Sequence, residues 1–547
     1  MERTGRPDAR GLDAHGEKTA AARGVAWGGI ESATSALVGL VLTPFVVRAC
    51  GIEGLGLWGA SWSLAHTTHL LDLGVGASYS RFTSKAIAIS DTAGLNRILG
   101  AGMGFHLGLG ILLSAIALVC GPRALGLVVP GGPLAGQAAT VFGCTLATVV
   151  LRTVLSGYRG VVAGAQRLDR LGRIGSTVSL LEGCGAALAL SGGFGLRGMA
   201  LNSLLAAGLA SFLEATAAHR LVPGLRPVPF AAGRAEWREL LSFGMRIQIV
   251  RVSEILGAHL PRLLLAGASG FVAAGLYDLG AKIAGILQIA ALPLPVIQPL
   301  AGRLDARGDD QSVRALVERA TRYVALLAVP CLALVLLDAE AVLRAWTGRD
   351  IPQASATAAR LLAAAAALSF MVSPLRLVLR GMGRPGPEAR AALGGSLVHV
   401  GLAAGLAAPY GAPGVAAAAL LGAALAAALL TRGALRIAPR LVRPTGLAVP
   451  APVLAGLGGL LAGGALRLAV LGAHLPVATR TAALTRLLPE GIVLVSAAFL
   501  LAVWLRAFTR DDLAALAGAL PGAGRAAGPR ASGPAGPHAA LGAAGRT

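Results

Sequence analysis

Long uninterrupted runs of apolar residues constrain most strongly what this chain can fold into. Residues 24–47, 98–120 and 449–470 are examples, and a helix of about 20 residues suffices to cross a hydrocarbon core of about 30 Å. Of the 547 residues, 55% are hydrophobic and only 14% are charged, against roughly 25% charged in soluble domains. So few polar side chains cannot cover a soluble fold, which excludes a soluble enzyme, a secreted disulfide scaffold and a disordered polymer. The pattern predicts an all-α polytopic membrane protein.

Apolar windows, turn residues and charges together predict about 14 transmembrane helices. They cover residues 24–47, 55–76, 98–120, 134–155, 175–194, 198–218, 241–266, 272–298, 321–343, 355–378, 391–408, 413–431, 449–471 and 489–506. Between the eighth and ninth, Asp309 and Asp310 are suitable N-caps, and the charges that follow predict a short amphipathic cytoplasmic helix within residues 305–319.

The net charge of +22, from 48 basic against 26 acidic residues, needs an explanation. In a soluble protein such an excess would indicate nucleic-acid binding. Here most of the lysines and arginines fall in alternate loops, as they do in the cytoplasmic loops of membrane proteins. The alternation predicts that both termini are cytoplasmic. The charge therefore sets topology, and we expect no nucleic-acid partner.

Two segments of the chain resemble each other. Residues 44–60 read PFVVRACGIEGLGLWGA and residues 261–281 read PRLLLAGASGFVAAGLYDLGA, and both lead from a proline to Gly-Leu-aromatic and Gly-Ala. They lie six spans apart, which predicts two six-helix halves related by an axis along the membrane normal, as in alternating-access transporters. The predicted organisation is an N-terminal cytoplasmic segment (1–23), a six-helix bundle (24–218), a cytoplasmic linker (219–240), a second six-helix bundle (241–431), two additional transmembrane helices (432–506) and a disordered cytoplasmic tail (507–547).

The first hairpin carries a pattern found in a known family. Between residues 43 and 81 the chain has a proline, an arginine and a glycine before a Gly-aromatic pair, then Asp-Leu-Gly and a basic residue. These are Pro44, Arg48, Gly51, Gly56–Trp58, Asp72–Gly74 and Arg81. The stretch resembles the bacterial polysaccharide (O-antigen type) flippases of the multidrug/oligosaccharidyl-lipid/polysaccharide exporter superfamily. Residues 158–172 and 242–282 resemble the same family, but Pro261–Arg262 stands where relatives often carry an acidic residue.

The resemblance implies a transporter rather than an enzyme. It would flip a polyprenyl-diphosphate-linked oligosaccharide across the bacterial cytoplasmic membrane by alternating access, for the assembly of surface polysaccharide such as lipopolysaccharide. Its partners would be the lipid-linked oligosaccharide, membrane lipids and a polysaccharide polymerase or glycosyltransferases.

Two alternative functions stay open. One is an ion-coupled drug or small-molecule antiporter of the same superfamily, for which 12 spans would be expected. The other is a membrane-embedded polysaccharide polymerase or glycosyltransferase. Such enzymes usually have a large extracytoplasmic loop with catalytic acids, whereas the predicted outer loops here are short.

Ionisable side chains inside the spans are candidates for function, because each costs roughly 2.5–3.5 kcal/mol at the centre of a membrane helix. Guanidinium and ammonium groups bind phosphate oxygens, so a hydrated, cationic cavity between the two halves could hold a diphosphate. The candidate substrate-binding residues are Arg246, Arg251, Lys282 and, at the outer mouth, Arg48. Alternatively, Arg251–Glu254 and Asp278–Lys282 are internal ion pairs that only hold helices in register.

Acidic groups at membrane depth can also bind a coupling proton or sodium ion. The candidates are Glu31, Asp72, Glu254 and Asp278. Asp72 stands beside Gly74, so a turn or capping role is an equal alternative.

Other motifs do not indicate a cofactor. His66, His69 and Asp72 share a helix face at i,i+3 spacing, but without another ligand cluster we expect the two histidines to line a water-filled cavity rather than bind a metal. Residues 54–59 spell GxGxxG without a preceding strand, so nucleotide binding is not expected. The five cysteines are scattered, with no CxxC pair.

Overall fold

The computed structural model describes residues 14–128, 135–230, 233–285 and 297–439, with the single residues 287, 294, 487 and 496. All regular secondary structure in these residues is helical. Nine of the described helices are long and apolar enough to cross a membrane. The predicted all-α polytopic membrane fold is therefore confirmed. The predicted spans 449–471 and 489–506 and the tail 507–547 lie outside the described residues and stay predictions.

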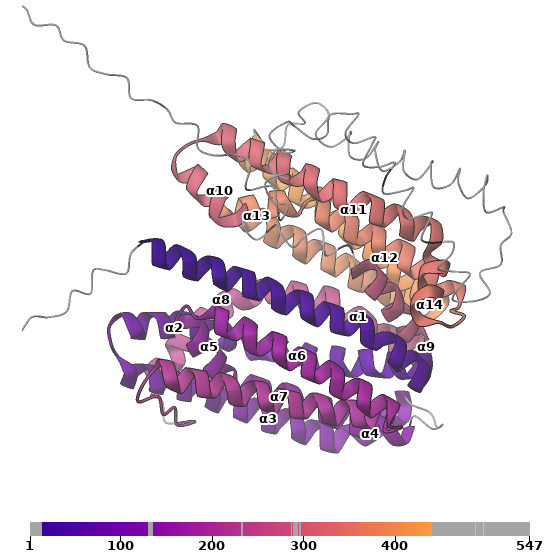
Figure 1. Ribbon diagram of the computed structural model, residues 1–547, viewed down its shortest axis with the longest axis horizontal. Coiled ribbons are helices and arrows are strands. Elements are labelled where there is room, and N and C mark those ends of the chain that lie inside the picture. The colour runs from indigo at the N-terminus through magenta and orange to yellow at the C-terminus, as the bar shows by residue number, and fades with distance from the viewer. Residues whose placement is uncertain are drawn as a thin grey trace, which may run out of the picture.

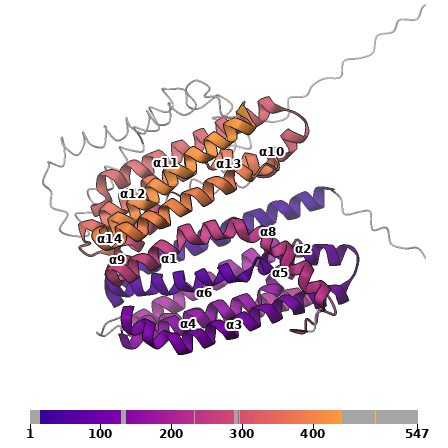
Figure 2. The same ribbon diagram turned by 180° about the vertical axis from the view of Figure 1, so that it is seen from behind.

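The described helices form two groups (Figures 1 and 2), with α1–α7 on one side, α10–α14 on the other and α8 and α9 between them. The first group and its connections are α1 (Ala14–Thr67), the 3₁₀ helix η1 (Thr68–Asp72), α2 (Val75–Ala88), α3 (Thr92–Val128), α4 (Ala135–Val154), α5 (Ser156–Gly164), α6 (Leu168–Ser191) and α7 (Gly195–Leu221). The remainder are α8 (Arg234–Ala258), α9 (Leu260–Gly285), α10 (Ile297–Ala306), α11 (Asp310–Thr347), α12 (Gln353–Met371), α13 (Ser373–Gly381) and α14 (Gly386–Ile437).

Three of the long helices are divided by a glycine with a positive φ. Gly51 in α1 has φ 73° and ψ −177°, Gly270 in α9 has φ 80° and ψ 174°, and Gly411 in α14 has φ 56° and ψ −137°. Glycine adopts such angles without steric cost, unlike other residues. Each of these three helices contains parts of two predicted spans, so the nine described membrane helices correspond to 12 of the 14 predicted spans.

The two repeated segments cross each other reciprocally. Gly56 lies five residues after the turn in α1, and Gly275 lies five residues after the turn in α9. A Cβ atom on Gly56 would overlap the carbonyl oxygen of Phe271, and one on Gly275 would overlap the carbonyl oxygen of Ile52. Contacts exchanged in this way are typical of elements related by a two-fold axis. The matched turn and crossing give the sequence repeat a structural counterpart.

Helix α6 approaches α1 closely along a row of glycines. A Cβ atom on Gly172, Gly175 or Gly183 of α6 would collide with Trp27, Glu31 or Val38 of α1, respectively. Small residues let membrane helices approach until their backbones are nearly in contact. This packing holds the part of α1 that precedes Gly51 against α6, one of the helices around the cavity described below.

The predicted cytoplasmic helix within residues 305–319 is only partly correct. Asp309 is an N-cap, since its carboxylate accepts a hydrogen bond from the backbone N–H of Ser312 at 3.0 Å. Hydrogen bonding from the side chain and then the backbone N–H of Ser312 holds the pKa of Asp309 below its usual value. However, the helix does not end near Arg319 but continues as α11 to Thr347, because neither glycine nor proline interrupts the chain until Pro330. The prediction of a separate short helix was wrong.

We predict that Gly56→Ala lowers the thermal stability of the protein. The added methyl group meets a backbone carbonyl, so α1 and α9 must move apart, and overpacking of this kind costs about 1–3 kcal/mol. Gly28→Ala in the same helix is the matched control, because a Cβ atom there has no neighbour within 4 Å. Thermal unfolding of the purified protein in detergent measures both. Equal melting temperatures for the two variants would contradict the crossing.

Candidate functional site

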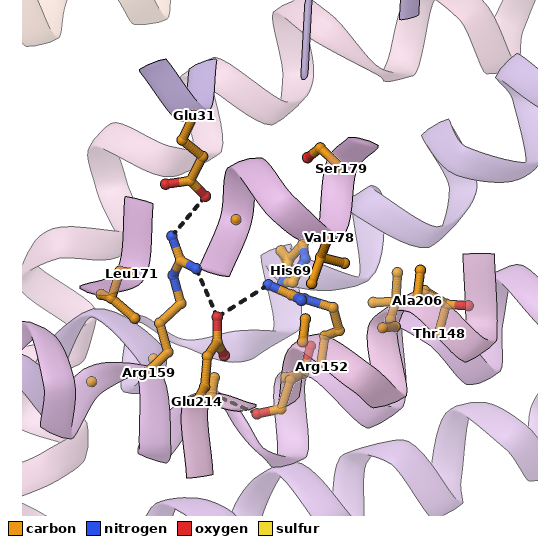
Figure 3. Close-up of a pocket in the computed structure, with 18 of the residues that line it drawn as sticks. Glu31, His69, Thr148, Arg152, Arg159, Leu171, Val178, Ser179, Ala206 and Glu214 are labelled. Carbon is orange, nitrogen blue, oxygen red and sulfur yellow. Dashed lines mark hydrogen bonds and ion pairs between the residues drawn. The ribbon is translucent and has the colours of Figure 1, made fainter. Parts of the chain in front are cut away.

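A cavity of about 650 Å³ lies within the first group of helices, lined by residues of α1, η1, α2 and α4–α7 (Figure 3). This volume falls within the range of about 300–1,000 Å³ typical of ligand sites. Its ionisable lining residues are four acids, two arginines and two histidines, namely Glu31, Asp72, Glu182, Glu214, Arg152, Arg159, His66 and His69.

Glu214 of α7 is the centre of an ion-pair network in this cavity (Figure 3). Its carboxylate accepts a hydrogen bond from Arg159 of α5 at 2.8 Å, and the guanidinium of Arg152 of α4 lies 3.7 Å away. Arg159 also donates to Glu31 of α1 at 3.4 Å. The network therefore connects α1, α4, α5 and α7, and both arginines are neutralised by acids already present.

Hydroxyl groups line another part of the cavity. Ser203 of α7 donates to Glu182 of α6 at 2.6 Å, and the hydroxyls of Ser35 and Ser179 lie 2.9 Å apart. The buried hydroxyl of Thr153 has no hydrogen-bond partner among the described residues. The cavity thus offers both donors and acceptors to a polar ligand.

The helix that begins after Gly51 breaks beside this cavity. It ends at Thr67, continues as η1, and then turns at Leu73 (φ 50°) and Gly74 (φ 73°), both left-handed. The predicted span 55–76 therefore ends near Asp72, and the turn given as an alternative beside Gly74 is present. Asp72 accepts a hydrogen bond from the backbone N–H of Gly76 at 3.2 Å, so it caps the next helix. His66, His69 and Asp72 all line this cavity, which lies within the first group of helices and not between the two halves, where the sequence predicted a cavity.

Asp72 also contacts a buried histidine of α3. Its carboxylate lies 2.5 Å from Nε2 of His106, and Nδ1 of His106 lies 3.2 Å from the hydroxyl of Tyr79. The His106 side chain is fully buried, and that of Asp72 is 4% exposed. The three side chains form a polar chain that leads from the cavity into the helix packing behind it.

Asp278 has a partner that the sequence did not indicate. It forms an ion pair with Arg262 at 2.5 Å, rather than with Lys282. The turn at Gly270 reverses the chain and brings the arm that carries Arg262 beside the arm that carries Asp278. The interpretation of Asp278–Lys282 as the ion pair was therefore wrong.

Lys282 of α9 instead faces α1. Its Nζ atom lies 3.7 Å from the position that a Cβ atom on Gly39 would occupy. Since α1 packs with α6 and α9 packs with α12 and α14, this ammonium group lies where the two groups of helices meet.

The other predicted residues have different surroundings. Arg246, Arg251 and Glu254 lie on α8, but their side chains are outside the described part of the structure. Arg48 is exposed, three residues before the Gly51 turn, and its carbonyl oxygen accepts a hydrogen bond from Arg349 at 3.2 Å. Nearby, Trp346 donates to the carbonyl oxygen of Leu40 at 3.0 Å. These contacts join α1 to the second group of helices at the Gly51 end.

Several cavity residues were missed by the sequence analysis. Glu182 and Glu214 lie within the predicted spans 175–194 and 198–218, so the cost of burying a charge in a membrane helix could have identified them. The charge alternation had assigned Arg159 to a loop, and His106 had no distinguishing neighbour in sequence. Among the described residues, no group of three or more histidine, cysteine, aspartate and glutamate side chains is placed to hold a metal ion.

The fold is that of the transporters of the MOP superfamily. The chain is similar to the lipid II flippase MurJ in an inward closed conformation, with a TM-score of 0.64 and 12% identity over 87% of this chain and 98% of that one. It is also similar to an inward-facing multidrug resistance MATE family transporter, with a TM-score of 0.61 and 16% identity over 75% and 96% of the two chains. A MOP superfamily transporter from Pyrococcus furiosus gives a TM-score of 0.51 at 17% identity, over 78% and 96%.

A family model described as "Polysaccharide biosynthesis protein" matches residues 137–353. No curated protein matches the chain in sequence. The family model and the shared fold confirm the resemblance to a polysaccharide flippase family of the MOP superfamily. The chain is a multi-pass membrane protein whose structural neighbours are transporters and a flippase.

We predict that Glu214→Gln destabilises the protein more than Glu31→Gln does. The Glu214 side chain is 4% exposed and faces two arginines, whereas Glu31 is 27% exposed and faces only Arg159 among the ion pairs of the described residues. Removing one partner of a fully buried pair costs about 3–5 kcal/mol, and partial exposure of the arginines reduces this to about 2 kcal/mol. Thermal unfolding in detergent ranks the two variants, and the reverse order would contradict the central role of Glu214.

Proposed function

We propose that this protein flips a polyprenyl-diphosphate-linked oligosaccharide across the bacterial cytoplasmic membrane by alternating access. The observation that carries the proposal is the position of Lys282, a cation at membrane depth where the two groups of helices meet. In the described part of the chain no carboxylate lies within ion-pair distance of Lys282, and Asp278, which attracts it electrostatically, is already paired with Arg262. A cation that shares its acid with another cation favours an anionic ligand.

The proposed substrate has the matching charge. A diphosphate is a strong anion, and ammonium and guanidinium groups form charge-assisted hydrogen bonds to its oxygens. We assign Lys282 to the diphosphate, with Arg246 and Arg251 of α8 as further contacts and Arg48 at the outer mouth.

The direction of transport follows from the proposed orientation. The alternation of basic loops supports a cytoplasmic position for both termini, which puts the Gly51 turn at the outer end in this proposal. The contacts of Trp346 with Leu40 and of Arg349 with Arg48 then hold the outer end together. While these two contacts hold the outer end closed, the substrate enters from the inner leaflet. When the contacts break, the substrate leaves on the outer side. The polymerase or glycosyltransferases of the same pathway are the proposed partners, and no catalytic role is assigned to the chain.

A second candidate function is an ion-coupled antiporter for cationic drugs or other small molecules. The observation that favours it is the excess of acids in the cavity, where four acidic side chains accompany two arginines. The two functions differ in the charge of the substrate, so one set of transport measurements can separate them.

We predict that Lys282→Ala reduces flipping about 10-fold, because a hydrogen bond to a charged group contributes about 1.5–3 kcal/mol. The measurement uses purified protein in proteoliposomes that contain a fluorescent polyprenyl-diphosphate oligosaccharide. Lys85→Ala is the control, since Lys85 is exposed near the end of α2. Normal flipping by Lys282→Ala would remove Lys282 from the mechanism. Absence of flipping by the unaltered protein, together with export of a cationic dye, would favour the antiporter.

Among the four acids proposed for ion coupling, we favour Asp72. Arg262 engages Asp278 and Arg159 contacts Glu31, whereas Asp72 contacts the neutralisable imidazole of His106. Glu254 remains a candidate whose side chain is outside the described part. A carboxylate and an imidazole at 2.5 Å can share one proton, and Asp72 also lines the cavity.

We predict that Asp72→Asn and His106→Gln abolish the response of transport to a pH gradient. In the unaltered protein a proton taken up by the pair changes the contacts of the broken helix, with His69 and Tyr79 as adjacent titratable groups. Flipping is measured in proteoliposomes with and without an imposed gradient. Asp91→Asn is the matched control, because Asp91 likewise accepts a backbone hydrogen bond, from Gly94 at 2.7 Å, at a helix start. An unchanged response in both variants would exclude the pair.

A further inference from the structure

Four aromatic and imidazole rings follow one another along the second arm of α1 and into η1. We call Trp58, Trp62, His66 and His69 the ring track. Successive ring centroids are 5.8, 5.5 and 5.8 Å apart. Their spacing of four, four and three residues places all four on one helix face. A continuous row of rings within a membrane protein offers flat, partly apolar surfaces to a ligand.

The ring track connects the cavity with the boundary between the two groups of helices. Trp62, His66 and His69 line the cavity, whereas Trp58 packs against the hydrophobic core. His66 also stacks on His259, which lies at the break between α8 and α9, with centroids 4.9 Å apart and ring planes at 18°. A ligand on the track would therefore reach from the cavity toward the boundary at which Lys282 lies.

The charges of the cavity do not suit an anion. Both arginines are neutralised by Glu214 and Glu31, and Glu182 and Asp72 add further negative charge. The same lining includes Ser179 and the Ser203–Glu182 pair. A neutral ligand rich in hydroxyl groups can satisfy these donors and acceptors, which an apolar ligand would leave unpaired.

We propose that this cavity is a saccharide subsite, in which Trp62 is the platform on which a sugar ring stacks. A sugar ring has C–H faces that pack against an aromatic ring, while the hydroxyls at its edge hydrogen-bond with polar side chains. Ser179 and Glu182 are the proposed hydroxyl partners. This inference rests on the proposed function, since it divides the substrate between two places, with the diphosphate near Lys282 and the saccharide on the ring track.

Substrate preference tests the subsite. Proteoliposomes are prepared with either the lipid-linked saccharide extracted from the source bacterium or bare polyprenyl diphosphate. We expect the unaltered protein to flip the saccharide-bearing lipid faster, and Trp62→Ala to reduce that preference about 10-fold while the rate for bare diphosphate is unchanged. Trp62→Phe keeps an aromatic face and should retain most of the preference. Trp27→Ala is the control, because Trp27 contacts α6 outside the cavity lining.

Two results would overturn the subsite. The first is an unchanged preference of Trp62→Ala for the saccharide-bearing lipid. The second is an equal loss of the flipping rate for both lipids in Trp62→Ala, when this variant has the melting temperature of the unaltered protein. A direct measurement of saccharide binding distinguishes failure of the subsite from failure of the proposed flippase function. The saccharide released from the lipid by mild acid should change the tryptophan fluorescence of the unaltered protein in a saturable manner but not that of Trp62→Ala, even if no lipid is flipped. Saturation by ethidium and not by the saccharide would instead assign the cavity to cationic ligands.

Discussion

The crossing of α1 and α9 depends on backbone contact between two glycines and two carbonyl groups. Gly56 meets Phe271 and Gly275 meets Ile52, so neither helix can carry a side chain at its point of contact. The crossing also brings the carboxylate of Asp278 to the place where a Cβ atom on Gly59 would lie. Helices held this closely keep the turns at Gly51 and Gly270 together. The crossing therefore sets the distance between the two groups of helices at that end of the molecule.

Neutralisation of charge is the second constraint, because a membrane interior solvates ions poorly. Glu214 is paired with Arg152 and Arg159, and Asp278 with Arg262. The Glu214 pairs connect α4, α5 and α7 at the cavity, whereas the Arg262–Asp278 pair connects the two arms of α9 outside the cavity lining. Lys282 differs from these side chains because it forms no ion pair within the described residues. This property, and not the total positive charge of the chain, indicates where an anionic substrate is proposed to bind.

The sequence predicted the helical architecture because the bilayer imposes the length and polarity of each span locally. It predicted that His66, His69 and Asp72 share a helix face because helical spacing is also local. It could not predict the pairing of Asp278 with Arg262, which requires the reversal at Gly270, nor the meeting of Arg159 with Glu214, which requires α5 to pack on α7. Gly74 indicated a turn beside Asp72, but the left-handed conformation of Leu73 is uncommon for leucine and could not be predicted.

The proposed substrate has an anionic part and a neutral, hydroxylated part, and each needs different binding groups inside the membrane. The two proposed sites bind these parts separately. The ring track moves with the first group of helices, whereas Lys282 belongs to α9, which packs with the second group. Rocking of the two groups about the glycine crossing must then change the distance between the saccharide and diphosphate sites. The stacking of His66 on His259 spans the same boundary, so it must break or slide during that motion. A flexible link between the diphosphate and the distal sugars would let one substrate occupy both sites while their separation changes.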